Sequence, residues 1–559
     1  MKSRTKVVVI GGGIAGCSTL YHLTEEGWAD VVLIERDELT SGTTWHSAAQ
    51  VTNFGMNQTT VGLKTHSIQL YKKLRDDPEY PVGYHHGDGG IRLANTPEQM
   101  QAYRHFASMA KGMGTTFEVI DAEECARRHP LISTDNLLGG LWDGEDGDID
   151  PAQLCQALAF HARKAGAEVY RHTNVVSLKQ HKDDTWTVET DKGSIDADIV
   201  VNACGYRVNE VGGMMGVHHP VTSMEHQYFV TEDIPAIAEA GHRMPLLRCP
   251  ISDYYSRQEK NGLLVGFYEQ DCKTWGMDGI SPNFVNDLCP DDLDRVMDVL
   301  EGAFERMPAL TEVGIKRVYN GAIAYTPDGN PIIGPAWDLD NFWLNEGHSF
   351  GITAAGGAGW QLAEWIVEGE PTIDMLGVDP RRYGSYATKS YLKVKNEEAY
   401  ANVFVTHFPD EERAEARPLR TAPCYDRLRA LGAVFGQKFG CERANWFAPE
   451  GVPQEDHWSF RRSNYFTHIG NEVRNVTENA GLLDMSAFAK ARISGPGAEA
   501  FLNHLVANKL PKKVGRVALC HALTERGGVH SEFTIQRESA TSFYLVSAGA
   551  GQRLDHDWI

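Results

Sequence analysis

The chain has 559 residues, 42% of them hydrophobic and 23% charged, and its formal net charge is −22 at pH 7. This length predicts about two or three domains, because a single core rarely grows so large. The strong negative charge disfavours nucleic acid and anionic membranes as partners, and without a run of about 18 apolar residues we expect no membrane span.

The first 46 residues follow the pattern of a dinucleotide-binding unit. An apolar strand at 7–10 leads into a glycine-rich turn, a helix is expected at 17–26, and a second strand at 31–34 ends at Glu35. Because the first strand begins so close to Met1, we expect no signal or transit peptide and a cytoplasmic location.

The glycines of this turn each have a role in holding the ligand. Gly11 permits a tight bend, Gly13 lets the backbone approach a pyrophosphate, and Gly16 lets the helix pack on the strand. The N–H groups at the helix start attract phosphates. Glu35 can accept hydrogen bonds from a ribose diol and disfavours the extra phosphate of NADP, which leaves NAD and FAD. The predicted contacts are Gly11, Gly13, Ile14, Ala15, Gly16, Glu35 and Arg36.

The middle of the chain mixes helical and strand patterns. Three helices are expected, near residues 63–74, 97–110 and 151–165. The segment 139–148 predicts a strand that runs into an acidic turn, which could bind a cation but lacks EF-hand spacing.

Two further stretches favour strands. Residues 168–205 predict short strands of the nucleotide fold, and Val176 among them is expected to contact the dinucleotide. Residues 215–320 alternate in strand fashion around one helix at 291–306. This alternation predicts an antiparallel sheet that roofs the cofactor.

A second glycine-rich strand-to-helix junction follows the first by about 330 residues. It comprises a strand at 342–344, a loop at 347–352 and a helix at 354–367. One NAD fold does not need this junction, whereas a large flavin must be held at both ends, so FAD is favoured. The loop residues expected to contact it are Gly347, His348, Ser349, Phe350, Gly351 and Ile352.

Composition predicts three parts: an oxidoreductase part at 1–370, a connector at 371–475 and a new unit at 476–559. In the first part, a substrate sheet at about 85–170 and 215–320 interleaves with the nucleotide fold. The ten cysteines include no CxxC pair, so we expect reduced thiols and no metal site.

Long motifs spread over the whole chain carry a family resemblance. They are VVVIGGGIAG, LIERDELTSGTTWHSAA, LGGLWDGEDGDIDP, HQYFVTE, YYSRQEKNGLLVGFYE, FAPEGV, SFRRSNYF and GLLDMSAFAKARISGPGAEAFL. The chain resembles the dimethylglycine and sarcosine dehydrogenase family of flavin-dependent N-methyl amine oxidoreductases. This resemblance implies an α/β (α+β) fold: a Rossmann-like FAD domain of the D-amino-acid-oxidase type with an antiparallel substrate sheet, a connector, and the start of an aminomethyltransferase-like domain.

The resemblance also assigns the flavin attachment. In that family the His of the matching Thr-Thr-Trp-His stretch carries the flavin covalently through its 8α-methyl, which points to His46. An imidazole is a plausible nucleophile toward this methyl group, whereas an ordinary loop His would only bond to backbone. The remaining cofactor contacts that the resemblance implies are Gly42, Thr43, Thr44, Trp45 and Arg207.

A His–Tyr pair near the substrate amine is the family's other site feature. The matching residues are His226 and Tyr254, with Tyr255 expected to face the other side of its strand. Hydride leaves the N-methyl carbon only when the nitrogen lone pair is free, so such a pair can take the ammonium proton. The alternative is that both residues make ordinary hydrogen bonds in a sheet.

The final unit resembles the start of the folate-binding aminomethyltransferase domain, where Glu532 matches a carboxylate that binds tetrahydrofolate. Only about the first 85 residues of that domain are present, which puts a complete folate pocket in doubt. Two positions depart from the family pattern: Arg207 and His348 could change the substrate or the electron acceptor. His348 could equally bind a carboxylate or cap a helix.

Taken together, the resemblance implies FAD-dependent demethylation of a small N-methyl amino acid, most simply dimethylglycine to sarcosine. The one-carbon unit would leave as formaldehyde or pass to tetrahydrofolate, and electrons would pass to an electron-transfer flavoprotein or to oxygen. The alternatives are an oxidase or dehydrogenase of sarcosine or another amine, a folate-binding carrier with a vestigial flavin domain, and an NAD dehydrogenase.

Overall fold

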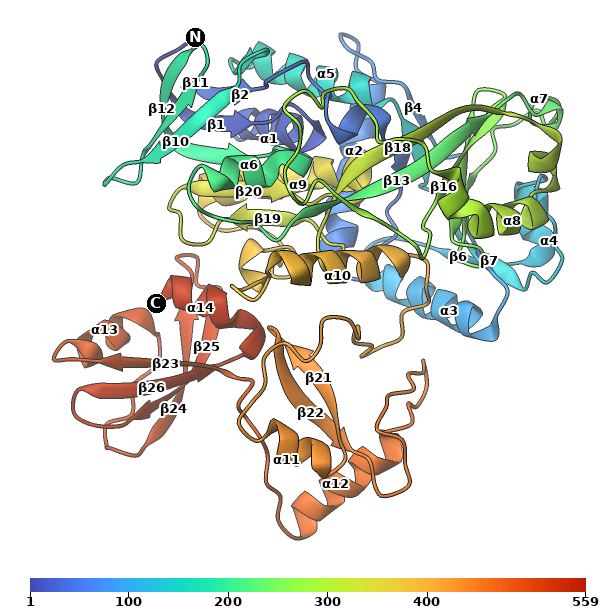
Figure 1. Ribbon diagram of the computed structural model, residues 1–559. Helices are drawn as coiled ribbons and strands as arrows, with labels where there is room; N and C mark the ends of the chain where they lie inside the picture. The colour runs from blue at the N-terminus through green and yellow to red at the C-terminus, as the bar shows by residue number, and fades with distance from the viewer. The chain divides into compact units, whose positions relative to one another are not determined.

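The computed structural model describes residues 1–559, which form two compact units. Unit 1 comprises Met1–Pro380 and Lys389–His407, and unit 2 comprises Arg381–Thr388 and Phe408–Ile559. Figure 1 traces the elements of both in chain order. Helices and sheets alternate throughout unit 1, which confirms the predicted mixed α/β class.

The nucleotide-binding pattern folds into an eight-stranded sheet in unit 1. Its strands are β10 (Val175–Gln180), β11 (Trp186–Thr190), β12 (Gly193–Asn202), β1 (Arg4–Ile10), β2 (Val31–Ile34) and β9 (Glu168–Tyr170), with β20 (Phe342–Glu346) beside β12 and β19 (Ile332–Pro335) beside β20. Ile10 lies opposite both Ile34 and Asn202 in parallel pairings. The carboxyl ends of β1, β2 and β12 therefore meet at one edge, where open α/β sheets bind ligands.

Four helices of unit 1 pack on one another, and glycines permit the closest of these contacts. The four helices are α1 (Ile14–Glu25), α2 (Gln58–Arg75), α5 (Pro151–Lys164) and α9 (Gly351–Glu368). A Cβ on Gly359 would lie 2.3 Å from Ser18 Oγ in α1, and a Cβ on Gly357 would lie 2.1 Å from the Leu63 carbonyl oxygen in α2. The glycines inside α9 therefore serve helix packing, which leaves the loop before it to meet a ligand.

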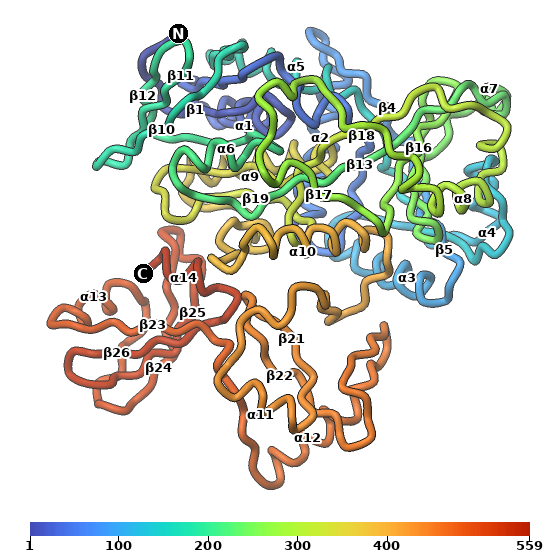
Figure 2. The backbone as a smooth tube through the Cα atoms, viewed as in Figure 1, coloured from blue at the N-terminus to red at the C-terminus, as the bar shows by residue number.

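The second sheet of unit 1 has nine strands. Eight of them follow the order β17 (Thr274–Trp275), β13 (Thr222–Thr231), β16 (Gly262–Phe267), β15 (Tyr254–Glu259), β14 (Leu246–Cys249), β5 (Gly90–Ala94), β7 (Gly139–Asp143) and β6 (Glu118–Asp121), and β18 (Ile315–Tyr325) pairs with β13. The pairing of β14 with β5 is parallel, which corrects the prediction of a purely antiparallel sheet. Figure 2 shows how this sheet joins chain segments far apart in sequence.

The predicted helices near 63–74, 97–110 and 151–165 are confirmed within a few residues as α2, α3 (Pro97–Gly112) and α5. The helix predicted at 291–306 is shorter, because a 3-10 turn, η3 (Leu293–Val296), precedes α8 (Met297–Arg306). In unit 1, a small sheet consists of β3 (Gln50–Val51), β4 (Tyr84–His86) and β8 (Gly147–Ile149). The other elements of this unit are the 3-10 turns η1 (Thr43–His46), η2 (Gly205–Arg207) and η4 (Pro308–Glu312) and the helices α4 (Ala122–Arg128), α6 (Val208–Gly213), α7 (Pro235–Glu239) and α10 (Lys389–Ala401). A further 3-10 turn, η5 (Pro380–Arg382), begins at the last residue of the first segment of unit 1 and continues into unit 2.

Unit 2 holds two antiparallel sheets. The smaller consists of β21 (Ala433–Lys438) and β22 (Cys441–Phe447), and the larger follows the order β23 (Ala489–Ser494), β26 (Ser542–Ser547), β25 (Val529–Arg537) and β24 (Val517–Leu523). Its helices are α11 (Tyr425–Ala430), α12 (Phe466–Glu478), α13 (Ala498–Leu505) and α14 (Gln552–Trp558), with a 3-10 turn, η6 (Gly549–Gly551). The predicted boundary at residue 475 lies inside this unit, near the end of α12.

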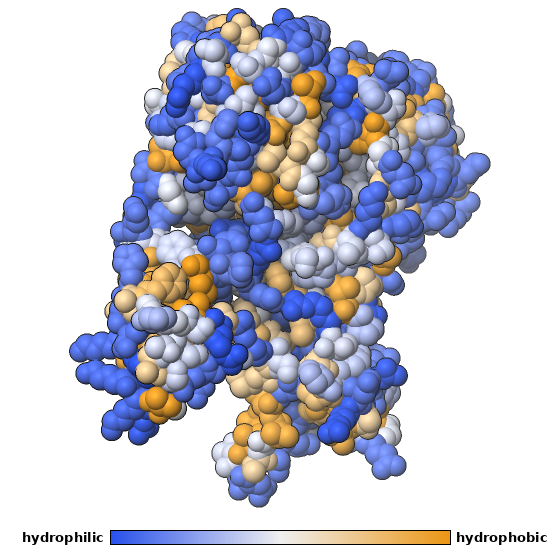
Figure 3. Space-filling view, turned by 60° about the vertical axis from the view of Figure 1, so that its left-hand side comes forward, coloured by the Kyte–Doolittle hydropathy of each residue, from blue (hydrophilic) through white to orange (hydrophobic).

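Apolar side chains remain exposed in unit 2. No residue of α12 is buried, although Phe466, Val473 and Val476 lie on it, and the following residues Leu482 and Leu483 are fully or mostly exposed. Figure 3 shows hydrophobic residues at the surface of this part of the chain. No helix anywhere in the structure combines the length and apolar character that crossing a bilayer requires.

His129 gives the fold of unit 1 a pH dependence that can be tested. It follows α4, is fully buried, and neither ring nitrogen has a hydrogen-bond partner. Burial lowers the pKa of His129 to about 4 from an ordinary value near 6.5. The unfolded chain therefore takes up a proton below pH 6.5 that the folded chain refuses, so stability is present above that pH and falls as the pH drops toward 4.

We expect His129→Leu to remove this loss, because leucine has a similar volume and no proton to bind. At pH 5, His129 lowers the free energy of unfolding of the unmodified chain by about 2 kcal/mol, which corresponds to a few degrees in the midpoint of thermal unfolding. Thermal unfolding midpoints at pH 8 and pH 5 measure it, with His85→Gln, at an exposed position, as the control. Equal midpoint shifts in His129→Leu and the unmodified chain would contradict the assignment.

Candidate active site

The glycine-rich turn after β1 has the geometry that a pyrophosphate requires. Gly11 has a φ of +109°, and a Cβ there would lie 2.3 Å from the Ala203 carbonyl oxygen. A Cβ on Gly16 would lie 1.9 Å from the Gly11 carbonyl oxygen. Gly13 caps α1 without any side-chain hydrogen bond. The helix start is thus closely packed from behind, and its N-cap residue brings no side chain to the N–H groups there.

The loop before His46 is fixed against this helix start. Thr44 Oγ1 accepts a hydrogen bond from the Ile14 N–H at 3.1 Å, and Thr43 Oγ1 donates to the Ala322 carbonyl oxygen at 2.8 Å. Gly42 lies just before this turn, with the Tyr206 ring 3.6 Å from where its Cβ would be. The loop therefore links the nucleotide fold to β18 of the second sheet.

Glu35 lies at the end of β2, where its carboxylate accepts the N–H groups of Gly12 and Asp37 at 2.7 and 2.8 Å. Burial raises the pKa of Glu35, and these two hydrogen bonds oppose the shift. Val176 lies on β10 at a break in register between residues 175 and 177, with its side chain half exposed. Such a break leaves the Val176 backbone groups available to a base edge.

The second glycine-rich loop lies against the first. His348 Nε2 bonds to Asn345 Oδ1 at 2.7 Å, and Asn345 Nδ2 donates to Thr19 Oγ1 of α1 at 3.0 Å. A Cβ on Gly351 would lie 3.8 Å from the Ile14 side chain. The predicted loop residues 347–352, with Ser349 bonded to the Gly329 carbonyl oxygen, therefore face the start of α1. His348 holds this loop in place.

Two arginines predicted to contact the cofactor bond to a loop of the chain in the structure. Arg207 is buried, pairs with Glu210, and donates to the carbonyl oxygens of Ser281 and Phe284 at 2.8 and 3.0 Å. Arg36 donates to the Pro282 carbonyl oxygen at 2.7 Å. These acceptors engage the Arg207 guanidinium in holding the loop, and the predicted cofactor contact of Arg207 stays a prediction.

His46 is buried against a glycine of the second sheet. A Cβ on Gly321 would lie 2.2 Å from both Cε1 and Nδ1 of the His46 ring. Gly321 in β18 lies directly opposite His226 in β13, so the ring lies beside His226. Burial lowers the pKa of His46 to about 4, which keeps the imidazole neutral, and the Trp45 ring meets it edge to face at 5.2 Å. A neutral imidazole has the lone pair that a nucleophile needs.

His226 forms a pair with Tyr255 rather than with Tyr254. The Tyr255 hydroxyl lies 2.8 Å from His226 Nε2, and the Tyr400 hydroxyl lies 2.8 Å from Nδ1. The Tyr254 hydroxyl has no partner, and its ring belongs to the apolar core on the other face of the sheet. The predicted pairing of His226 with Tyr254 is therefore wrong, as is the expectation that Tyr255 faces away.

Strand register explains this correction. Tyr255 lies opposite Gly266, and Gly266 lies opposite Tyr228, two residues from His226 in β13. Residues directly opposite share a face and alternate residues of a strand share a face, so Tyr255 and His226 lie on the same side. A Cβ on Gly266 would lie 2.2 Å from the Tyr255 hydroxyl, so this glycine gives the ring room to cross toward His226.

A cluster of cations lies near this pair and was missed by the sequence analysis. Arg92 of β5 stacks over the Phe54 ring at 3.8 Å and makes no ion pair. Lys64 donates to the Phe54 carbonyl oxygen at 2.6 Å and lies 5.8 Å from the Phe350 ring. A cavity in the same place is lined by Thr52, Phe54, Gly90, Arg92, Leu141, Asp143, Asp146 and Arg248.

The cluster carries more positive than negative charge. Arg248 pairs with buried Asp146, whereas Asp143 has its pKa raised well above its usual range by burial and by the Asp146 charge. Burial and then repulsion from Arg92 and Arg248 lower the pKa of Lys64 to about 7, and burial lowers that of Arg92 to about 10. The cluster is therefore suited to an anion.

Aromatic rings connect the cations to the His226 pair. The Tyr268 ring lies 4.9 Å from the His226 ring, 6.0 Å from the Tyr255 ring and 6.4 Å from the Phe350 ring. Burial raises the pKa of Tyr268, and the positive charges of Arg248 and Arg92 oppose that shift. An anionic group near Arg92 and a nitrogen near Tyr255 would thus both lie in the neighbourhood of Tyr268. In the chain, no cluster of three or more His, Cys, Asp or Glu residues could hold a metal ion.

The residues around the glycine turn fit an FAD. The helix start and Glu35 suit the pyrophosphate and ribose, as described above. Glu346, which ends β20 beside the second loop, is buried and both its carboxylate oxygens are unpartnered. Burial raises the pKa of Glu346, and the backbone N–H groups of Cys204 and Gly205 oppose this shift, so a polar ligand group would complete its hydrogen bonding.

The residue matched to folate binding lies in unit 2. Glu532 in β25 lies opposite His521 in β24, and His521 Nε2 contacts its Oε2 at 3.1 Å. The Glu532 side chain is 58% exposed. Its predicted role in folate binding stays a prediction.

Family models match three consecutive stretches of the chain. Residues 6–365 match the model described as FAD dependent oxidoreductase, residues 368–422 match the FAD dependent oxidoreductase central domain, and residues 424–559 match the GCVT N-terminal domain. The last match begins inside the stretch predicted as connector, 371–475.

Individual proteins are similar to the whole chain. Mitochondrial dimethylglycine dehydrogenase of Rattus norvegicus is 38% identical over 563 residues, which cover all of this chain and 66% of that protein. Mitochondrial sarcosine dehydrogenase of Homo sapiens is 31% identical, with coverage of 100% and 65%. Thus the predicted family resemblance is confirmed, and the chain spans about 65% of the length of these relatives.

Among solved structures, L-proline dehydrogenase from P. horikoshii superposes with a TM-score of 0.61 at 26% identity. The match covers 68% of this chain and 98% of that chain. The shared part is thus of the size of the FAD dependent oxidoreductase match.

Proposed function

The chain belongs to the FAD dependent oxidoreductase family, and from that premise we propose that it demethylates a small N-methyl amino acid by oxidation. Dimethylglycine is the substrate we favour, and sarcosine or another N-methyl amino acid is the alternative. The relatives named dimethylglycine and sarcosine dehydrogenases support this choice. The observation that carries the proposal is a neutral His226 that is bonded to Tyr255, lies beside His46 and contacts Tyr268, on which the charge of the unpaired Arg92 acts.

FAD, when bound, accepts a hydride from the methyl carbon next to the substrate nitrogen. The chain would hold it with the glycine turn and α1 start at the pyrophosphate, Glu35 at the ribose, and the loops around 42–46 and 347–352 nearer the ring. We propose that His46 forms a covalent bond to it. The neutral state and burial of His46 against Gly321 support this role.

Tyr255 and His226 prepare the amine in this proposal. An N-methyl amino acid reaches the site as an ammonium ion, which has no lone pair to assist hydride loss. The Tyr255 oxygen accepts the ammonium proton while its own proton moves to His226 Nε2, 2.8 Å away. Burial lowers the pKa of His226 to about 3, so the ring stays neutral at neutral pH and takes up a proton on Nε2 only while it releases the one on Nδ1.

The substrate carboxylate binds at Arg92 in this proposal. Arg92 is the arginine of the cluster that has no carboxylate partner, and a bidentate bond to an arginine orients a planar carboxylate. This site separates amino acids from amines that lack the acid group. It thereby supports an amino acid as the substrate.

The products and the second half of the reaction follow from the same proposal. Hydrolysis of the oxidised substrate releases formaldehyde, or tetrahydrofolate takes up the one-carbon unit if a folate site involving Glu532 is functional. An electron-transfer flavoprotein or oxygen is the proposed electron acceptor. The match of residues 424–559 to the GCVT N-terminal domain supports the folate option.

We expect acid-precipitated holoenzyme to stay yellow, because the covalent bond to His46 survives unfolding. Mass spectrometry of a digest should find a flavin mass on the peptide that contains His46. The His46→Ala variant should give a colourless pellet, while His226→Gln, which alters the neighbouring imidazole, should still give a yellow one. A colourless pellet from the unmodified protein would contradict the covalent assignment.

Substitution of Tyr255 by phenylalanine should slow flavin bleaching by dimethylglycine about 100-fold at pH 7, the range expected for loss of a general base. Tyr254→Phe is the matched control, because it removes an unpartnered hydroxyl from an apolar core and should leave bleaching unchanged. Stopped-flow absorbance measures both rates. A slow Tyr254→Phe and a normal Tyr255→Phe would restore the pairing that the structure overturns.

Arg92→Gln should raise the KM for dimethylglycine about 10- to 100-fold, the cost of losing a charged hydrogen bond, with little change in kcat. Arg317→Gln, at an exposed position over the Tyr319 ring, is the control. Dimethylethylamine, which lacks the carboxylate, should be a poor substrate of both proteins to the same extent. An unchanged KM for the acid would exclude Arg92 from its recognition.

A further inference from the structure

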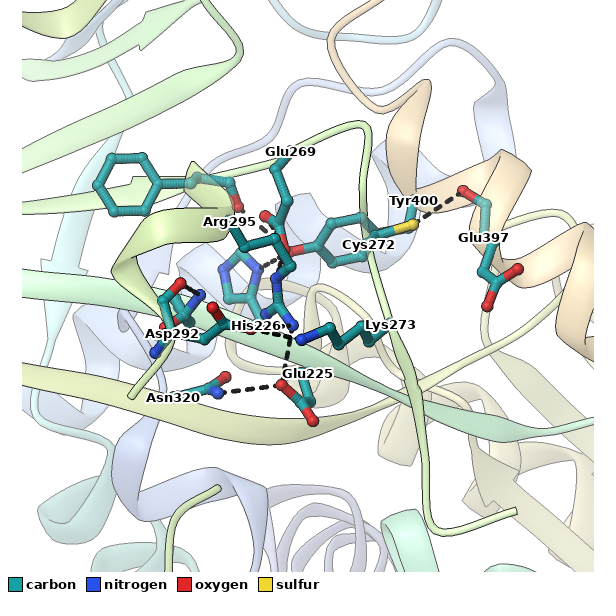
Figure 4. A network of polar contacts seen from close by, with 12 residues as sticks. Glu225, His226, Glu269, Cys272, Lys273, Asp292, Arg295, Asn320, Glu397 and Tyr400 are labelled. Carbon is teal, nitrogen blue, oxygen red and sulfur yellow. Dashed lines mark hydrogen bonds and ion pairs between the residues drawn. The ribbon is translucent and has the colours of Figure 1, made fainter. Parts of the chain in front are cut away.

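The pair of His226 and Tyr255 is continued on its far side by residues that no step of the proposed reaction uses. Tyr400 comes from α10, 174 residues after His226, and its hydroxyl lies 2.8 Å from His226 Nδ1. The same hydroxyl lies 3.2 Å from Glu269 Oε2 and 3.3 Å from the Phe267 carbonyl oxygen. Figure 4 shows Tyr400 between His226 and Glu269.

Donor and acceptor counting gives these hydrogen bonds a direction. A phenol has one hydrogen, and Tyr400 faces two oxygens, those of Glu269 and Phe267, that only accept while Glu269 is ionised. If Tyr400 donated its hydrogen to His226, the Tyr400 oxygen would face the oxygens of Glu269 and Phe267 with no hydrogen between them. Tyr400 therefore donates toward these oxygens and accepts from the Nδ1–H of His226.

The direction of the Tyr400 hydrogen bonds also determines which group donates between His226 and Tyr255. With its hydrogen on Nδ1, neutral His226 has a lone pair on Nε2, so the Tyr255 hydroxyl donates to it. The remaining lone pairs of the Tyr255 oxygen are then available to the proton of a bound ammonium. In the opposite arrangement, Tyr255 would have to accept from His226 and would present its own hydrogen to the cation.

Glu269 is placed to receive a proton at the end of this series. It is buried, and its Oε1 lies 2.9 Å from Nε of Arg295 in η3. Arg295 also contacts Glu225 at 2.9 Å, and Asn320 donates to the same Glu225 oxygen at 3.1 Å. Arg295 therefore keeps a carboxylate partner when Glu269 becomes neutral, and neutralising Glu269 leaves no buried cation unpaired.

The network continues from there to the surface. Arg295 lies 3.5 Å from Asp292, and Asp292 pairs with Lys273, whose side chain is half exposed. Figure 4 shows this sequence of side chains below Glu269. When Glu269 takes up a proton, Asp292 and Lys273, which contact water, can thus compensate for the change in charge beside Arg295.

We propose that Tyr400 and Glu269 set the His226 tautomer and complete a proton relay that removes the proton of the substrate ammonium. This inference rests on the proposed function. Tyr400 and Glu269 are positioning residues, because they act through His226 rather than on the substrate.

The relay balances as a set of proton transfers without any redox step. The N–H bond of the ammonium breaks, and its proton bonds to the Tyr255 oxygen. The former Tyr255 proton moves to His226 Nε2, the Nδ1 proton moves to the Tyr400 oxygen, and the Tyr400 proton moves to Glu269 Oε2. The substrate becomes a neutral amine and Glu269 a neutral acid, while the three groups between them end with the same charge as before.

The surroundings of Glu269 agree with this role. Burial raises the pKa of Glu269, and Arg295 and Tyr400 oppose the shift. The titratable groups that act on Glu269 or on His226 from the packed elements are His46, Tyr255, Tyr268, Cys272, Arg295 and Tyr400. Of these, Arg295 is the cation beside Glu269 when His46 is neutral, and Arg295 also contacts the carboxylates of Glu225 and Asp292.

Stopped-flow reduction of the holoenzyme by dimethylglycine tests the relay. Tyr400→Phe and Glu269→Gln should each slow bleaching about 10- to 100-fold at pH 7 and change the KM less than twofold. The deficit should shrink at alkaline pH, where the substrate arrives as a free amine. Tyr325→Phe is the matched control: its ring lies 5.8 Å from that of Tyr400, and its hydroxyl takes no part in the series.

A second measurement is independent of turnover. ¹⁵N NMR of histidine-labelled holoenzyme, with His226 assigned by its absence in His226→Gln, should find the hydrogen on Nδ1 in the unmodified protein. It should find the Nε2–H form populated in Tyr400→Phe. A hydrogen on Nε2 in the unmodified protein would overturn the proposal.

The outcomes separate this inference from the proposed function. If no N-methyl amino acid bleaches the unmodified holoenzyme, the proposed function fails and the NMR measurement still decides the tautomer. If dimethylglycine bleaches the unmodified holoenzyme, the proposed function stands. The relay is then overturned if Tyr400→Phe and Glu269→Gln bleach as fast as Tyr325→Phe, or if their bleaching rates are reduced by the same factor at every pH.

Discussion

Two positions without a side chain decide where the site forms. At Gly321 the imidazole of His46 occupies the space of a Cβ, and at Gly266 the Tyr255 ring does the same. Each glycine lets a ring cross a neighbouring strand at van der Waals contact, which a larger residue would prevent. Because Gly321 is opposite His226 in β13, one register brings His46 and the His–Tyr pair together.

Much of the fold could be predicted because its causes are local. The glycine turn, the helix that follows and Glu35 belong to one short segment, and the spacing of that segment specifies their geometry. The choice between Tyr254 and Tyr255 is different, because adjacent residues of a strand differ only in face. Which face meets His226 depends on how β15, β16 and β13 align, and that alignment is a property of three separated segments.

The remaining omissions share this cause. Arg92 looked like an ordinary charged residue in a strand, and only the pairing of β5 with β14 brings it beside Arg248 and leaves it without an acid. Tyr400 lies in a stretch predicted as a connector. Arg207 was assigned by its position in a motif, and that position does not reveal its bonds to the carbonyl oxygens of a loop more than 70 residues away.

Helix α10 shows how firmly the distal part of the site is held. Asn396 donates to the Tyr325 carbonyl oxygen at 3.1 Å, and the Gln270 side chain donates to the Ala401 carbonyl oxygen at 2.8 Å. These bonds hold both ends of the helix turn that carries Tyr400. A proton relay needs fixed donor–acceptor distances, since each transfer fails if one hydrogen bond opens. The chain meets that need by tying a helix of the central stretch to the sheet that carries His226, so that this helix is part of the catalytic unit.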